Sequence, residues 1–151
     1  MTKAVLDTSV IIEYIDKKAQ LHRQAEAIFN AIQKGKLKAI IPNTTLTETY
    51  YVATKIYQAT KQRQPQQKAL SLVKWLHHLP TTEITGLQLP VIVEAGQIKL
   101  KYNLALTDCY ILAAAKHHNA KAVFKKREKE MLDKLALLEK EYPVIFLEDY
   151  K

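Results

Sequence analysis

The sequence predicts an α/β protein in which helices cover both faces of a parallel sheet. Short apolar runs recur along the chain, longer amphipathic segments separate them, and no repeat or Gly/Ser/Pro-rich linker divides the 151 residues. A buried parallel strand has a continuous apolar run, and its connection to the next parallel strand is usually a helix. We therefore expect three layers around four to five short parallel strands, in a single domain spanning residues 1–151.

The first segment predicts one strand and two helices. Residues 4–6 (AVL) are an apolar run bounded by charged residues, which indicates a buried strand. Residues 9–34 have apolar side chains at helical spacing, with a break near Lys17. A short helix and a longer helix are expected there, and Gly35 is expected just beyond the C-cap of the second.

A second strand and two further helices follow. Residues 39–42 are an apolar run that ends in proline. Thr45 and Glu48 have the spacing of a capping box, in which two side chains bond the free backbone N–H groups at the start of a helix. Another amphipathic helix is expected to begin after Pro65 and to end before Pro80.

The remaining sequence alternates strands and helices in the same way. Pro90 suits the first position of a helix, and Thr107 suits the N-cap of another helix that has Asp108 in its first turn. The expected elements are a strand at 82–85, helices at 89–101 and 107–118, a strand at 121–124, a helix at 126–140 and a strand at 144–147.

The charge balance is compatible with a polyanionic partner. The chain has 23 Lys and Arg against 15 Asp and Glu, a net charge of +8. Clustered cations release counterions when they meet phosphates, so nucleic acid is a natural partner for such a surface. A basic surface that only keeps the protein soluble explains the charge equally well. Charge alone leaves both interpretations open.

Cysteine content and hydropathy favour the cytoplasm. Cys109 is the only cysteine, so neither a disulfide nor a cysteine-based metal site is expected, which fits a reducing compartment. The apolar run at 4–6 is too short for a secretory signal, and nowhere do 18 apolar residues follow one another. We therefore expect a cytoplasmic protein without a membrane-spanning segment.

Acidic residues lie near the ends of several predicted strands. Asp7 follows the first strand, Glu48 lies early in the helix after the second, and Asp108 opens the helix before the fourth. Glu128 and Glu130 come shortly after the fourth strand. Ligands of open parallel sheets bind outside the carboxyl ends of the strands, where the strand order reverses. Carboxylates gathered there repel one another, and a divalent cation bound by oxygen ligands, Mg²⁺ or Mn²⁺, relieves the repulsion.

Each acid also has a local explanation. Asp7 suits the N-cap of the first helix, Glu48 the third position of its capping box, and Asp108 a favourable charge at a helix N-terminus. Lys and Glu alternate around Glu128 and Glu130, which is typical of a solvated helix face. The metal-site hypothesis therefore depends on the joint placement of the acids.

Three segments have a more specific pattern: "AVLDTSVII", "IIPNTTLTETYYV" and "LKYNLALTDCYILAAAKHHNAKAVF". Together they resemble the PIN-domain family, and within it the VapC-type toxin ribonucleases of type II toxin-antitoxin systems. Asp7, Glu48 and Asp108 match three of that family's metal-binding acids. The family commonly has Thr-x-Asp after the fourth strand, whereas this chain has "FKKREKEM". Glu128 is the nearest counterpart of the missing acid, and Glu130 is the other candidate.

The resemblance implies a Mg²⁺-dependent ribonuclease that hydrolyses phosphodiester bonds, with Mn²⁺ as an alternative ion. It implies catalytic roles for Asp7, Glu48, Asp108 and Glu128, with Asp7 and Asp108 as metal ligands, and it leaves open whether a second ion binds nearer Glu128. It also implies the toxin of a toxin-antitoxin pair, a cognate antitoxin and a homodimer. Because Thr-x-Asp is missing, a non-catalytic PIN-like RNA-binding module is the alternative.

Hydroxyl and basic residues near the acids are candidates to contact the substrate. The hydroxyls suit either a metal site and phosphate or the capping of helices. The basic residues follow the fourth strand, where they would flank the acids and attract a phosphate backbone. The candidates are Thr8, Ser9, Thr107, Lys125, Lys126 and Arg127.

Overall fold

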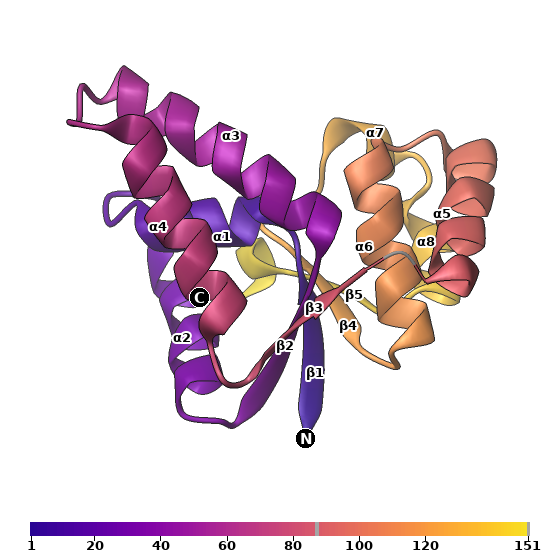
Figure 1. Ribbon diagram of the computed structural model, residues 1–151. Coiled ribbons are helices and arrows are strands. Elements are labelled where there is room, and N and C mark those ends of the chain that lie inside the picture. The colour runs from indigo at the N-terminus through magenta and orange to yellow at the C-terminus, as the bar shows by residue number, and fades with distance from the viewer. Residues whose placement is uncertain (87, 151) are drawn as a thin grey trace.

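Five parallel strands form one sheet in the order β3-β2-β1-β4-β5 (Figure 1). The computed structural model describes residues 1–86 and 88–150. The strands are β1 (Thr2–Leu6), β2 (Leu37–Pro42), β3 (Thr82–Thr85), β4 (Lys121–Phe124) and β5 (Val144–Phe146). All four neighbouring pairs are parallel, which confirms the predicted fold class.

The strand order reverses around β1. The chain adds β2 and β3 on one side of β1 and then returns to add β4 and β5 on the other side. Leu6 of β1 is paired with Val123 of β4, so both strands end at the same edge of the sheet. A ligand crevice is expected beyond this edge, between the ends of β1 and β4.

Helices cover both faces of the sheet, as predicted, in two groups (Figure 1). One face carries α1 (Thr8–Ile15), α2 (His22–Gln33), α3 (Asn43–Ala59) and α4 (Pro65–His78). The other carries α5 (Leu89–Tyr102), α6 (Leu106–His117), α7 (Lys129–Leu132) and α8 (Leu135–Glu141). A 3₁₀ turn, η1 (Leu147–Asp149), follows β5.

Two hydrophobic cores lie on opposite sides of the sheet. Ala4 and Leu6 pack toward α1–α4, whereas Val5 packs toward α5 and α6. This is the alternation that the two-residue period of a strand requires. The central residues of β1, β2 and β4 are apolar and buried because helices cover both faces of the sheet there.

Gly35 ends α2 as the sequence predicts. Its φ is +72°, its N–H donates to Ile32 O, and the N–H of Lys36 donates to Ala31 O. These two bonds satisfy carbonyl groups of the last helical turn, and glycine adopts the left-handed backbone without steric cost.

Both predicted threonine caps are wrong. α3 begins directly after Pro42, so Thr45 is a buried residue inside the helix and makes no capping box with Glu48. α6 begins at Leu106 with Ala105 at its N-cap, so Thr107 also lies inside its helix. Extended backbone at Pro42 and Ala105 takes the chain directly into each helix, so Pro42 and Ala105 occupy the N-cap positions that the sequence assigned to the threonines.

The single helix predicted at 126–140 is also wrong. Residues 125–128 form a loop, α7 has only four residues, and a turn in which Lys134 N–H donates to Met131 O precedes α8. The ammonium of Lys134 bonds the backbone carbonyl of Tyr102 at the end of α5. Such tertiary contacts compete with a continuous helix and cannot be predicted from local helix propensity.

Within residues 1–86 and 88–150, no helix has the length and hydropathy needed to cross a bilayer.

Candidate active site

Asp7 is held at the edge of the sheet by its backbone and its side chain. Its N–H donates to Val123 O of β4 at 3.0 Å, which continues the β1–β4 pairing by one residue. Asp7 Oδ2 accepts hydrogen bonds from Ser9 N at 3.0 Å and from Ser9 Oγ at 2.5 Å. Asp7 is therefore the N-cap of α1, as its local explanation proposed, and capping uses one of its two carboxylate oxygens.

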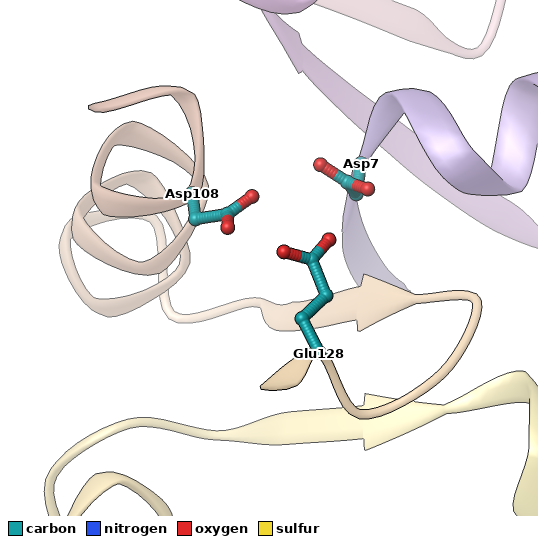
Figure 2. A group of neighbouring side chains, drawn as sticks. All are labelled: Asp7, Asp108 and Glu128. Carbon is teal, nitrogen blue, oxygen red and sulfur yellow. The ribbon is translucent and has the colours of Figure 1, made fainter. Parts of the chain in front are cut away.

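Three carboxylates meet beyond the ends of β1 and β4 (Figure 2). Asp7 follows β1, Asp108 lies in the first turn of α6, and Glu128 lies on the loop between β4 and α7. One oxygen from each carboxylate lies within 4.8 Å of the other two. Glu130 lies on α7, is exposed and is not among the acids of this cluster.

Burial and mutual repulsion disfavour the charged forms of the two aspartates. Burial raises the pKa of Asp7 to about 6, although its bonds from Ser9 oppose the change. Burial first, and then the charges of Asp7 and Glu128, raise the pKa of Asp108 to about 9. A cation placed among the three carboxylates would offset both effects.

Glu48, on α3, lines the same cleft as the three clustered acids. Glu48 Oε2 accepts a hydrogen bond from Thr107 Oγ at 3.3 Å and a weak one from Tyr51 OH at 3.5 Å. The hydroxyl that the sequence assigned to a helix cap therefore orients a candidate acid instead. Glu48, Thr107 and the three clustered acids line a cleft of about 330 Å³.

Two hydroxyls at the start of α1 line this cleft and differ in their contacts. Ser9 Oγ bonds Asp7 and accepts a hydrogen bond from Lys125 N at 3.1 Å, so it links β1 to the loop after β4. Thr8 is buried, and its Oγ has no hydrogen-bond partner within residues 1–86 and 88–150. A buried hydroxyl without a partner is costly, so a ligand in the cleft would stabilise this arrangement.

The three basic candidates have different surroundings. Lys125 lines the cleft, and its Nζ lies 3.0 Å from Glu13 Oε1. Lys126 is exposed. The guanidinium of Arg127 pairs with the carboxylates of Glu148 and Asp149 in η1. Of the three, Lys125 is thus the one that lines the cleft.

Glu13 is a residue of the cleft that sequence reasoning missed. It is only 3% exposed, and its Oε2 accepts a hydrogen bond from the N–H of Leu21, which closes the loop between α1 and α2. Glu13 lies four residues after Ser9, on the same face of α1, and this spacing is the signal that could have placed it at the site.

Lys125 is expected to stabilise the fold through Glu13. In a Lys125→Met variant the buried carboxylate of Glu13 loses its cationic partner, so the free energy of unfolding should fall by about 2 kcal/mol. Urea denaturation measures this change. Lys126→Met, on the same loop, is the matched control and should change stability by less than about 0.5 kcal/mol. Equal stability of the two variants would contradict the role given to the Glu13–Lys125 pair.

The donor set of the cleft fits a hard divalent cation. The three clustered ligands are carboxylate oxygens, which suit Mg²⁺ and Mn²⁺. Two of these acids are buried and repel each other, and the partnerless hydroxyl of Thr8 lines the same cleft. Each observation indicates that the residues are arranged for a bound group.

Solved structures share the fold over 79% to 97% of the chain. A toxin-antitoxin complex from Klebsiella pneumoniae matches with a TM-score of 0.62 and 19% identity, covering 95% of this chain and 97% of that chain. DNA-bound VapBC from Salmonella typhimurium matches with a TM-score of 0.66 and 19% identity, covering 97% and 99%. VapC20 from Mycobacterium tuberculosis, a toxin that cleaves the sarcin-ricin loop, matches with a TM-score of 0.62 and 12% identity. The match covers 79% of this chain and 86% of that chain. At these identities the similarity establishes the fold.

Sequence comparison gives the family. No curated protein sequence matches the chain. The family model of the PIN domain matches residues 4–136, a range that contains Asp7, Glu48, Asp108 and Glu128. With most of the chain matched and the same fold in the solved structures, the chain belongs to the PIN domain family.

Proposed function

We propose that this protein is a metal-dependent endoribonuclease and the toxin of a toxin-antitoxin pair. The observation that carries the proposal is the cluster of Asp7, Asp108 and Glu128 at the strand-order reversal of a PIN domain. Nucleic acid as the substrate agrees with the net charge of +8. The cytoplasm is the proposed site of action.

The acids have separate roles in this proposal. Asp7, Asp108 and Glu128 would hold the divalent ion, Mg²⁺ or Mn²⁺. When bound, the ion would supply charge stabilisation to a phosphate oxygen and lower the pKa of a water molecule. Glu48 lines the same cleft and accepts a hydrogen bond from Thr107, and in this proposal it would take the proton of the attacking water. The mutual proximity of Asp7, Asp108 and Glu128 supports a single ion bound by all three.

Among the remaining candidates, Thr8, Lys125 and Lys126 are the proposed contacts to RNA. The hydroxyl of Thr8 donates to a phosphate oxygen, and Ser9 holds Asp7 in place. Lys125 has two ammonium protons beyond the one that faces Glu13, and these attract the phosphate backbone. Lys126 adds an exposed charge. Arg127 is the weaker candidate because two carboxylates already engage it.

A cognate antitoxin and a second copy of the chain are the proposed protein partners. The similarity to a toxin-antitoxin complex and to VapBC supports an antitoxin partner, which in this proposal covers the cleft. The dimer is supported by Leu89, Val93 and Leu100, exposed apolar residues of α5 whose spacings of four and seven place them on one face.

RNA cleavage by the purified protein tests the proposal. We expect RNA to be cleaved in the presence of Mg²⁺ and cleavage to stop when EDTA removes the ion. Undiminished cleavage in EDTA would contradict the metal-dependent mechanism. RNA binding without cleavage in either Mg²⁺ or Mn²⁺ would favour the non-catalytic RNA-binding module instead.

A further inference from the structure

Arg127, the residue before Glu128, is bound by the C-terminal turn. Its two terminal nitrogens bond both oxygens of Asp149, at 2.8 and 2.9 Å, and one of them also bonds Glu148 Oε1 at 2.9 Å. The guanidinium carbon lies 4.4 Å from the ring centroid of Phe146. Paired N–H donors on a carboxylate and stacking on a ring fix a guanidinium in both position and plane.

The backbone of the same loop is tied at several points. The N–H of Arg127 donates to Glu148 Oε1 at 2.9 Å, and the N–H of Glu148 donates to Lys125 O at 3.1 Å. The N–H of Lys125 donates to Ser9 Oγ at 3.1 Å. Between β4 and Glu128, the loop is therefore bonded on one side to α1 and on the other to η1.

Glu128 needs such support more than the other two metal-ligand candidates. Asp7 extends β1, and Asp108 lies within α6, so regular elements place both side chains. Glu128 has an extended backbone, with φ −83° and ψ 153°, at the end of the loop. Metal ligands must be held within a fraction of an ångström, and loops hold them less well than helices or strands.

The charges at Arg127 argue against an RNA contact. One guanidinium faces two carboxylates, those of Glu148 and Asp149, so the positive charge of Arg127 is already balanced by its partners. A phosphate approaching Arg127 would meet two like charges and would have to displace a carboxylate held by paired hydrogen bonds.

We propose that Arg127 is a positioning residue, which together with Glu148 and Asp149 fixes the loop that presents Glu128 to the metal. The inference deepens the proposed function, since it rests on the metal site of Asp7, Asp108 and Glu128. It makes the C-terminal turn η1 part of the support of that site. It also explains how an acid without the family's Thr-x-Asp context is held among the other carboxylates.

Metal affinity measured without RNA tests the role of Arg127. Mn²⁺ is titrated into the full-length protein and followed by electron paramagnetic resonance, for the wild type, Arg127→Met and Arg127→Lys. We expect the dissociation constant for Mn²⁺ to rise about tenfold in Arg127→Met, as is typical when a group that orients a ligand is lost. Arg127→Lys should be intermediate because it keeps the charge but loses the paired donors.

Two matched controls separate positioning from a general loss of stability. Lys126→Met removes a charge from the same loop, and Lys38→Met breaks the partly exposed Lys38–Glu83 pair, 2.9 Å long, at the β2–β3 edge. Both variants should bind Mn²⁺ as the wild type does. In an RNA-cleavage assay, saturating Mn²⁺ should restore the rate of Arg127→Met to within about twofold of the wild-type rate.

The outcomes distinguish this inference from the proposed function. Wild-type Mn²⁺ affinity in Arg127→Met, or a loss no larger than that in Lys38→Met, would overturn the positioning role. An unchanged Mn²⁺ affinity with a raised KM for RNA would overturn it in favour of an RNA contact. If the wild type binds Mn²⁺ but cleaves no RNA, the ribonuclease proposal fails, and the Mn²⁺ titration still decides the role of Arg127.

Discussion

Asp7→Asn and Asp108→Asn should each lower the rate of Mg²⁺-dependent RNA cleavage by about 10³-fold, which corresponds to about 4 kcal/mol of transition-state stabilisation. Each change replaces a carboxylate that is proposed to bind the metal by a neutral amide of nearly the same shape. Asn is as good an N-cap as Asp, so Asp7→Asn should keep the start of α1 intact. Single-turnover cleavage of an RNA oligonucleotide at saturating Mg²⁺ measures the change.

Glu130→Gln is the control for these variants. Glu130 follows the same strand as Glu128 but lies exposed on α7, outside the cluster, so its loss should leave the cleavage rate within about twofold. Glu128→Gln should lower the rate, because Glu128 belongs to the cluster. A large effect of Glu130→Gln with none of Glu128→Gln would show that the fourth acid had been assigned incorrectly.

The metal-free protein should lose stability as the pH rises from 5 to 9. The folded-state pKa of Asp7 is about 6 and that of Asp108 about 9, both above the ordinary value of 3.8. Folding therefore favours the protonated acids, and their contribution is complete below about pH 4 and is lost as the pH passes each folded-state pKa. For Asp7 the difference between the ordinary and the folded-state pKa corresponds to about 3 kcal/mol of folding stability. Urea denaturation in EDTA, at one-unit intervals of pH, measures the fall.

Asp108→Asn isolates this effect from other titrating groups. The variant removes one charge from the cluster, so it should be more stable than the wild type above neutral pH, and the difference should shrink toward pH 5. Saturating Mg²⁺ should stabilise the wild type most at high pH, where the ion meets ionised carboxylates. A stability difference between variant and wild type that does not change with pH would contradict the repulsion described for the cluster.

The central strands and the order of the elements could be predicted from the sequence because β1, β2 and β4 are buried on both faces. Burial of that kind produces continuous apolar runs such as residues 4–6 and 122–124, and the helices between them follow from amphipathic spacing. The same reasoning placed Asp7 and Asp108 at one edge of the sheet, because the carboxyl ends of parallel strands share an edge.

The contacts made by individual side chains could not be predicted in the same way. Thr107 has the local signature of an N-cap, yet its hydroxyl faces Glu48, which is 59 residues away in sequence. Arg127 is a basic residue in a basic segment, which suggests a contact to nucleic acid. Its guanidinium nevertheless pairs with Glu148 and Asp149, which follow the next strand. Local sequence patterns indicate which secondary structure a residue favours, whereas tertiary packing determines which side chains it contacts.

A crystal structure of the protein with Mn²⁺, measured at a wavelength where the ion scatters anomalously, tests the central claim most directly. We expect one strong anomalous peak within coordination distance of the carboxylates of Asp7, Asp108 and Glu128. A structure in which Mn²⁺ binds only elsewhere, or in which Glu128 points away from an ion held by the two aspartates, would contradict the assignment of these three acids to one metal site.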